Sequence, residues 1–302
     1  MELSLWPSTT QPWVELLEAV RHVDRTGWST VYVADHFMGD GGAFGPEEAP
    51  WLEATAVLAA LAGSTERVRL ASLVLSATYR HPAVLANWAA AVDQASGGRL
   101  TLGIGAGWQR NEHEQYGIEL GPPDTRVRRL EEYVQVVRGL LEGERTSLDG
   151  DFFSVRDAIC HPLPVQRPLP LLIGAKGDRM LGVVARRADR WNMWSTPEVM
   201  RERAAVLARR CERIGRDPAS VHRSTQCLVL VTDDRAEAQA FLESVAPRAA
   251  FAGAPAAFAE LVARHVEVGV DELVVPDWHL GRGARRTDAL DALREAAAPL
   301  LG

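Results

Sequence analysis

Short runs of aliphatic and β-branched residues alternate along the chain with longer segments whose apolar positions recur at helical spacing. The short runs predict strands, and the longer segments predict amphipathic helices. The expected strands are Leu3–Pro7, Val31–Ala34, Val68–Leu75, Leu100–Ile104, Leu171–Gly174, Trp191–Trp194, Ser224–Val231 and Glu272–Val275. The expected helices are Trp13–Thr26, which Gly27 ends, and residues 51–63, 82–95, 124–141, 180–187, 198–214, 235–245, 258–268 and 288–300.

This alternation predicts a parallel sheet, because parallel strands must be joined by crossover connections. Eight strand–helix units in 302 residues favour closure into a (β/α)8 TIM barrel of the α/β class, with loop insertions. The rival is an open Rossmann-type sheet, which carries GxGxxG in its first strand–helix turn, whereas the glycine run at 103–107 follows the fourth strand. We expect one domain over residues 1–302 with an insertion at about 144–170, in which Asp149–Phe153 forms a tight turn that enters a short extra strand.

Composition narrows the classes of function. The chain holds 33 Lys and Arg against 40 Asp and Glu, a net charge of −7, which argues against a nucleic-acid-binding face. Its 3 cysteines are far apart and offer neither a disulfide framework nor a zinc site, as is typical of a reducing cytoplasm. The first residues do not resemble a signal peptide, and no run approaches the ~20 apolar residues of a membrane span. We therefore expect a cytoplasmic protein without nucleic-acid or membrane partners.

The most reactive side chains are expected where the strands end, because active sites of (β/α)8 barrels lie at the carboxyl ends of the strands. Asp35 and His36 follow the second strand and precede a glycine-rich loop. An imidazole transfers protons near neutral pH, and a neighbouring carboxylate can fix its tautomer and raise its basicity. The alternative is that Asp35 caps a turn and His36 is a hydrogen-bonded structural residue.

Two glycine-rich strand ends allow the backbone to approach a ligand closely. Gly105-Ala106-Gly107-Trp108 follows the fourth strand, and Gly174-Ala175-Lys176-Gly177 precedes a helix. Backbone N–H groups at a helix start, with the charge of Lys176, suit a phosphate. Plain strand–helix turns would need the same glycines, so that alternative stays open.

The ends of the remaining strands are apolar or aromatic. The third strand ends at Leu73-Val74-Leu75-Ser76, where a flat ring could pack, although the run also reads as barrel core. Trp6 either walls a planar ligand or caps the barrel, and Trp194 is either a wall or part of the core. No HExxH, P-loop, GxSxG or Cys/His cluster is present, so we expect no metal and no acyl transfer.

Several segments carry motifs in a characteristic order and spacing: VYVADHF at 31–37, SLVL followed by His81-Pro82, RLTLGIGAGW at 99–108 with Glu112-His113 and Tyr116-Gly117, PLLIGAKG at 170–177 with ADRWN at 188–192, and IGRDP at 214–218. Over nearly the whole chain these segments resemble the luciferase-like monooxygenase superfamily. The Asp35-His36-Phe37 motif resembles its branch that uses the deazaflavin coenzyme F420.

The resemblance implies a (β/α)8 barrel, often a homodimer, that binds F420 or FMN at the carboxyl ends of the strands. His36 would lie near the reactive carbon of the cofactor, and Asp35 would contact its ring or polyol. A non-proline cis peptide would join Leu73 to Val74 beneath the ring, next to Ser76. Gly105, Ala106, Gly107 and Trp108 would line the cofactor, and Gly174, Ala175, Lys176 and Gly177 would bind its phosphate.

The chain departs from the best-known sugar-phosphate branch of this family. That branch carries a glutamate where Trp108 stands, and a phosphate-binding lysine where Ser195 and Thr196 follow the sixth strand. Glucose 6-phosphate is therefore not the expected substrate, and Trp6, Trp108 and Trp194 suggest a flatter and more apolar small molecule.

The resemblance leaves three functions open. The first is an F420-dependent oxidoreductase in which His36 supplies or removes a substrate proton while the cofactor carries hydride. The second is an FMN-dependent monooxygenase that uses reduced flavin and oxygen. The third is a barrel that only binds a flavin, as a carrier or sensor.

Overall fold

The computed structural model describes all 302 residues and contains a closed barrel of eight parallel strands. The strands are β1 (Glu2–Trp6), β2 (Thr30–Val33), β3 (Arg69–Ser72), β5 (Leu100–Gly105), β8 (Leu171–Gly174), β9 (Arg190–Asn192), β10 (His222–Gln226) and β13 (Glu272–Pro276). They pair in the order β3-β2-β1-β13-β10-β9-β8-β5, and the pairing of β3 with β5 closes the ring. The predicted (β/α)8 TIM barrel is confirmed.

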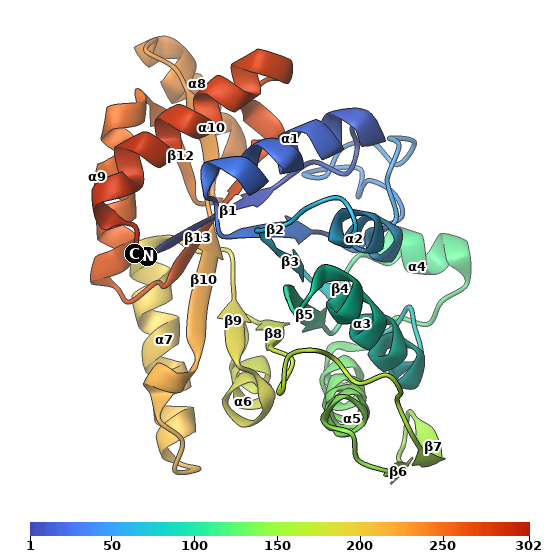
Figure 1. Ribbon diagram of the computed structural model, residues 1–302. Coiled ribbons are helices and arrows are strands. Elements are labelled where there is room, and N and C mark those ends of the chain that lie inside the picture. The colour runs from blue at the N-terminus through green and yellow to red at the C-terminus, as the bar shows by residue number, and fades with distance from the viewer.

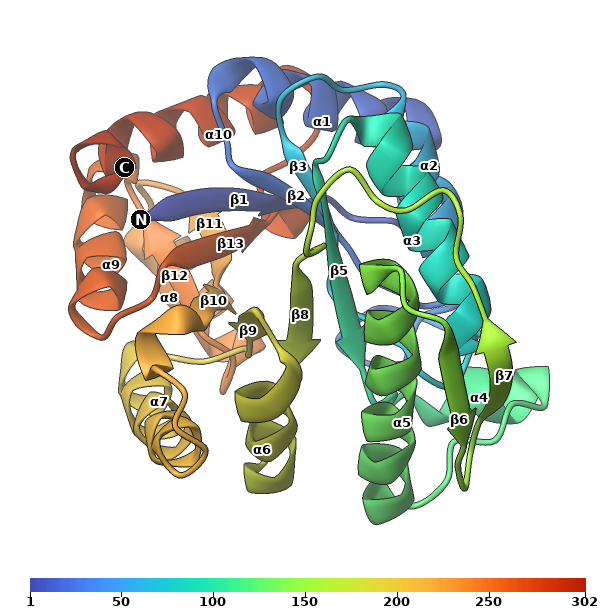
Figure 2. The ribbon, with the colours of Figure 1, turned by 60° about the horizontal axis from the view of Figure 1, so that its bottom comes forward.

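Helices surround the strands (Figures 1 and 2). They are α1 (Trp13–Thr26), α2 (Ala54–Ala62), α3 (Pro82–Ser96), α4 (Arg110–Tyr116), α5 (Pro123–Glu142), α6 (Asp178–Arg187), α7 (Pro197–Glu212), α8 (Arg235–Val245), α9 (Pro255–Glu267) and α10 (Gly283–Ala297). Short 3-10 helices cover Pro218–Ser220, Asp277–His279 and Ala298–Leu300. The two termini lie side by side, where the Met1 ammonium donates to the Leu300 carbonyl at 3.1 Å.

Successive side chains of β1 point to opposite faces of the barrel wall and pack into two different apolar clusters. Leu3 and Leu5 point outward into a cluster of 63 buried residues between barrel and helices. Ser4 and Trp6 belong to the opposite face, and Trp6 joins a small apolar cluster with Tyr32. Because successive side chains of a strand alternate between faces, this register directs Trp6 into the mouth of the barrel.

The prediction of a single strand over Ser224–Val231 is wrong, because this segment forms two strands in different sheets. β10 stays in the barrel, whereas β11 (Leu228–Val231) leaves it and pairs in parallel with β12 (Ala250–Gly253). The helix α8 is the crossover between β11 and β12. A continuous apolar run is compatible with either sheet, so the sequence pattern could not mark the change of partner.

The expected strand Val68–Leu75 is also interrupted. β3 ends at Ser72, the Leu73–Val74 peptide is cis as the resemblance implied, and β4 (Leu75–Ser76) continues beside β5. The helix α4 was not expected. Its sequence, RNEHEQY, is polar and short, so it has no apolar stripe that would identify it.

The insertion at 144–170 forms an antiparallel pair, β6 (Thr146–Asp149) and β7 (Ser154–Ala158), beside α5. Its tight turn closes with a hydrogen bond from the Gly150 N–H to the Phe153 carbonyl at 3.0 Å. The extra strand expected after this turn is β7.

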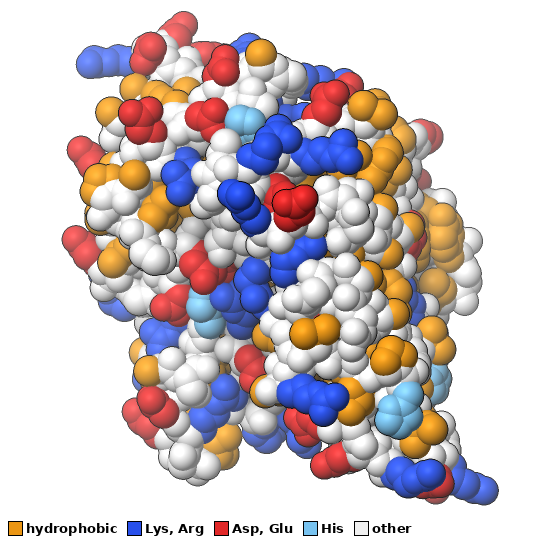
Figure 3. All heavy atoms as spheres, in the orientation of Figure 1, with side chains coloured by type: hydrophobic (Ala, Val, Ile, Leu, Met, Phe, Trp, Pro, Cys, Tyr) orange, Lys and Arg blue, Asp and Glu red, His pale blue; other side chains and the backbone are white.

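Acidic and basic side chains are interspersed over the face of the molecule shown in Figure 3. None of the helices has both the length and the apolar character that crossing a membrane would require.

Candidate functional site

A cavity of about 680 Å³ opens at the carboxyl ends of the strands. Of the residues predicted from the sequence, its wall includes Trp6, Asp35, His36, Leu73, Val74, Ser76, Gly105, Ala106, Gly107, Trp108, Gly174, Ala175, Lys176 and Trp194. Gly177 is the one predicted residue outside this wall, and it precedes the first turn of α6. The strand ends that the sequence singled out therefore meet in one place.

Val74 forms part of the cavity floor, and glycines make room for its side chain. A Cβ added at Gly174 would lie 3.1 Å from Val74 Cγ2, whereas one added at Gly103 would first overlap the backbone carbonyl of Ser72 and would also lie 3.2 Å from Val74 Cγ1. A Cβ at Gly105 would come closer still to Val74 Cγ2. Gly105 and Gly174 thus serve the packing of Val74, in addition to any contact of their backbone with a ligand, and Gly103 makes room for the Ser72 backbone as well.

His36 is held by Glu112, a fully buried carboxylate at the start of α4. The His36 Nδ1 lies 2.9 Å from Glu112 Oε1, and the Phe37 N–H donates to Glu112 Oε2 at 2.9 Å. The Tyr79 hydroxyl donates to the same Oε1. Because an ionised carboxylate only accepts hydrogen bonds, Nδ1 carries a proton and Nε2 remains free.

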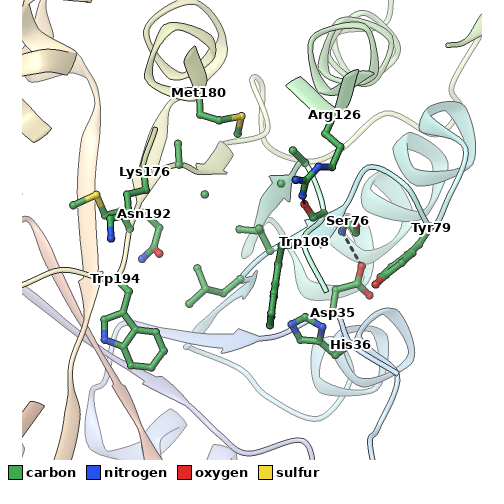
Figure 4. A pocket seen from close by; sticks show the side chains of 18 of the residues that line it. Asp35, His36, Ser76, Tyr79, Trp108, Arg126, Lys176, Met180, Asn192 and Trp194 are labelled. Atoms are coloured by element: carbon green, nitrogen blue, oxygen red, sulfur yellow. Dashed lines mark hydrogen bonds between the residues drawn. The ribbon is translucent and has the colours of Figure 1, made fainter. Parts of the chain in front are cut away.

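Asp35 has a different partner from the one expected. Its carboxylate accepts two hydrogen bonds from the Arg80 guanidinium, at 2.7 and 2.9 Å. It also accepts one from the Ser76 N–H at 2.8 Å (Figure 4). Arg80 also pairs with Glu53, the residue that caps α2. Asp35 therefore ties the end of β2 to the end of β4 and to the loop that precedes α3, and Glu112 is the carboxylate that orients His36.

The hydrogen bonds of Arg80 and Tyr79 keep Arg80 charged and Tyr79 protonated. Although burial opposes its charge, Arg80 has a raised pKa because it bonds to Asp35 and Glu53. Burial, and then the hydrogen bond to Glu112, raise the pKa of Tyr79 well above its usual value. Tyr79 is thus a neutral donor to Glu112 at any physiological pH.

Aromatic rings surround the His36 imidazole. The ring centroids of Trp108, Phe44 and Trp51 lie 5.3, 5.4 and 5.5 Å from that of His36. Trp108 stands beside the imidazole at the cavity mouth (Figure 4), and 51% of it is exposed. An exposed tryptophan beside a reactive side chain offers a surface for a flat ligand.

Two polar side chains that the sequence analysis did not select also line the cavity. Asn192 donates from Nδ2 to the Ser224 hydroxyl at 2.9 Å. Gln226, at the end of β10, is 6% exposed, and its Oε1 has no hydrogen-bond partner. A buried acceptor without a partner is costly unless a ligand supplies the donor.

Two cations face the cavity from different sides (Figure 4). Arg126, on α5, donates from Nη1 to the Gly107 carbonyl at 2.6 Å, and its buried Nε has no partner. Lys176 lies in the turn before α6. They could bind the anionic groups of a ligand whose ring lies over Val74.

The group of side chains close enough together to hold an ion is Glu2, His222 and Glu272, at the opposite end of the barrel strands. Arg190 already pairs there with Glu2 at 3.3 Å and with Glu272 at 3.7 Å.

The sequence profile described as luciferase-like monooxygenase matches residues 1–298. The F420-dependent glucose-6-phosphate dehydrogenase of Microbacterium testaceum (strain StLB037) is 35% identical over 179 residues, which are 58% of this chain and 51% of that protein. The pyrimidine monooxygenase RutA of Cronobacter sakazakii (strain ATCC BAA-894) is 32% identical over 176 residues, 56% of this chain and 51% of that protein. The chain thus spans about half the length of these curated relatives.

Solved structures share the fold over the whole chain. An F420-dependent secondary alcohol dehydrogenase in complex with an F420–acetone adduct superposes with a TM-score of 0.85 at 18% identity, covering 98% of each chain. The long-chain alkane monooxygenase LadA superposes with a TM-score of 0.81 at 14% identity, covering 100% of this chain and 92% of that one.

Proposed function

The chain belongs to the luciferase-like monooxygenase family, and from that premise we propose that it is an oxidoreductase that transfers hydride between coenzyme F420 and a small organic substrate. The observation that carries the proposal is the His36–Glu112 pair at the wall of a cavity large enough for a tricyclic ring. The 35% identical relative supports F420 as the cofactor. Its sugar-phosphate substrate is not extended to this chain, because Trp108 stands in place of a glutamate.

The residues of the cavity fit such a cofactor. Leu73 and Val74 offer an apolar surface on which a flat ring can rest. The unpartnered Oε1 of Gln226 is an acceptor for a ring N–H. Lys176 and the start of α6 suit the phosphate, as helix N-termini attract anions.

When bound, F420 supplies or accepts a hydride at its ring, and the side chains manage the proton. His36 donates from Nδ1 to Glu112, which leaves Nε2 as the nitrogen that can act as a base toward the cavity. In substrate oxidation Nε2 would take the proton of a hydroxyl, and in reduction the imidazolium would return it. Glu112 would stabilise the imidazolium, and Tyr79 would keep that carboxylate in place.

The aromatic wall would keep water away from the transferred hydride. Trp6, Phe44 and Trp194 line the cavity, and the centroids of Trp6 and Trp194 are 6.0 Å apart. Expelling water strengthens the electrostatic contacts of His36 with its substrate.

The proposal is tested by screening the purified protein for F420 reduction with alcohols, imines and unsaturated carbonyl compounds, following the absorbance of oxidised F420. Substrate-dependent reduction that is absent in His36→Ala supports it. The second candidate, an FMN-dependent monooxygenase, is favoured by the 32% identical pyrimidine monooxygenase. Oxygen consumption with reduced FMN, and no turnover with F420, would favour that candidate.

We further propose a homodimer, on the family resemblance alone. Size-exclusion chromatography coupled to light scattering measures the mass of the protein directly, and a monomeric mass would refute this assignment.

A further inference from the structure

A second cavity, of about 480 Å³, lies beside the first and shares Trp6 and Phe44 with it as a common wall. Its other sides come from the loop after β1, the segment that precedes α2, the end of α8 and the segment that follows β13. A substrate that spans this common wall could reach both the His36 cavity and the second one.

The second cavity is bounded by flat rings. The centroid of Trp278 lies 5.0 Å from that of Trp6 and 5.5 Å from that of Phe44. Trp51 is also part of the wall, and its buried indole N–H has no hydrogen-bond partner. Rings at these spacings and tilts favour an aromatic guest, which packs against them by its face or its edge.

Three arginines line this cavity, and two of them are already paired. Arg286 is buried and binds Asp277 at 3.1 Å, while Arg282 binds Glu15 at 3.3 Å. Arg248 forms no ion pair; it donates from Nε to the Val245 carbonyl at 3.3 Å. Its charge is therefore the uncompensated one in the cavity.

The surroundings of Arg248 hold its guanidinium in place without neutralising it. Its Cζ lies 5.9 Å from the centre of the Trp194 ring, in cation–π geometry. Burial, and then the charge of Arg248, lower the pKa of His279, which is therefore neutral at pH 7. The two terminal nitrogens of Arg248 remain available to a ligand.

We propose that this second cavity binds the carboxylate of an aromatic substrate, with Arg248 as its partner. A lone guanidinium matches the two oxygens of a planar carboxylate, whereas a phosphate dianion would need a second free cation. The aromatic ring of the substrate lies against Trp6 and Phe44, which places its far end toward His36. The assignment rests on the proposed function for the role of this ligand as substrate, and it deepens that function by naming the substrate class.

The test uses the full chain and measures the dissociation constant of 2-naphthoate by calorimetry. The neutral 2-naphthamide is the matched probe, and cyclohexanecarboxylate keeps the charge without the aromatic ring. Arg248→Gln removes the charge, and Arg235→Gln, at the exposed start of α8, is the control variant. We expect Arg248→Gln to weaken the binding of 2-naphthoate by about tenfold to a hundredfold and to leave the binding of 2-naphthamide unchanged. Arg235→Gln should change neither constant.

Arg248→Lys keeps the positive charge but replaces the planar guanidinium with an ammonium group. It therefore distinguishes loss of the ion pair from damage to the Trp194 contact. We expect it to retain part of the 2-naphthoate affinity. Equal binding of naphthoate and naphthamide, no measurable naphthoate binding, or equal affinity in Arg248→Gln and the wild type would overturn the proposal. So would binding of cyclohexanecarboxylate as tight as that of 2-naphthoate.

An F420 titration of the same samples separates the two proposals. Arg248-dependent naphthoate binding without F420 binding would overturn the proposed cofactor and leave the carboxylate site standing. If F420 binds but naphthoate binding does not depend on Arg248, the carboxylate site is overturned and the proposed cofactor stands.

Discussion

The Nδ1 of His36 lies 2.9 Å from Oε1 of Glu112, a residue 76 positions later in the chain that is wholly buried. His36 follows β2, and Glu112 lies in α4, so the pair exists only because the barrel brings these two strand ends together. The contact fixes which imidazole nitrogen is free, and the proposed proton transfer depends on that nitrogen.

His36→Ala should lower turnover by about a hundredfold or more and leave cofactor affinity nearly unchanged, because a positioned acid–base group contributes about 10²–10⁴-fold. Steady-state rates and a cofactor titration on the same preparation measure the two quantities. A collapse of cofactor affinity with unchanged turnover at saturation would make His36 a binding residue instead.

Glu112→Gln should lower kcat by at least about tenfold with little change in KM, because an amide can present its N–H to the imidazole and reverse the tautomer. Tyr79→Phe removes one hydrogen bond to the same carboxylate and should lower kcat by less than Glu112→Gln does. The separation of kcat from KM is the informative readout, since general loosening of the site would raise KM as well. A Glu112→Gln enzyme with wild-type kcat would remove Glu112 from the positioning of His36.

Gly105→Ala should disturb the cavity floor, because the added Cβ would meet Val74 Cγ2. Overpacking of this kind costs about 1–3 kcal/mol, so we expect a lower free energy of unfolding together with weaker cofactor binding. Gly63→Ala is the matched control, since its Cβ would meet nothing closer than 4.0 Å and its φ of −87° suits alanine. Equal stability and affinity in the two variants would show that Val74 does not need this space.

The stability of the protein should fall as the pH drops below about 6.5, partly through His265. Burial lowers the pKa of this imidazole, whose Nδ1 donates to the Leu261 carbonyl at 2.8 Å and whose buried Nε2 has no partner. The unfolded chain then binds a proton that the folded chain excludes, so stability is lost as the pH falls through the unfolded-state pKa. One such group changes stability by at most about 1.4 kcal/mol per pH unit.

Urea unfolding of the wild type and of His265→Leu between pH 7 and pH 5 measures this effect. The variant should show a smaller loss of stability on acidification. Parallel pH dependences of the two proteins would remove His265 from the acid response.

The sequence pattern predicted the barrel because most of its signals are local. The end of α1 at Gly27 is an example: this residue adopts a φ of 81°, and its N–H bonds to the Val23 carbonyl. The strand ends at Asp35, Gly105 and Gly174 were likewise readable, since each closes an apolar run. Local pattern and barrel topology together therefore located most of the cavity wall.

What the sequence analysis missed depends on contacts between distant segments. Glu112 was recognised only as part of a family motif and was given no role, because it lies in a polar helix without an apolar stripe and no local signal marks it as buried. Gln226 is recognisable only by its burial and its missing partner, which are properties of the folded chain. The pairing of Asp35 with Arg80 rather than with His36 is likewise set by the approach of two loops.

The most direct test of the central claim is a titration of the cofactor-free protein with F420 and with FMN, following the quenching of ligand fluorescence. We expect F420 to bind more tightly than FMN, and Gln226→Leu, which removes the unpartnered acceptor, to weaken F420 binding. Tighter binding of FMN, with oxygen consumed once the bound flavin is reduced, would contradict the account.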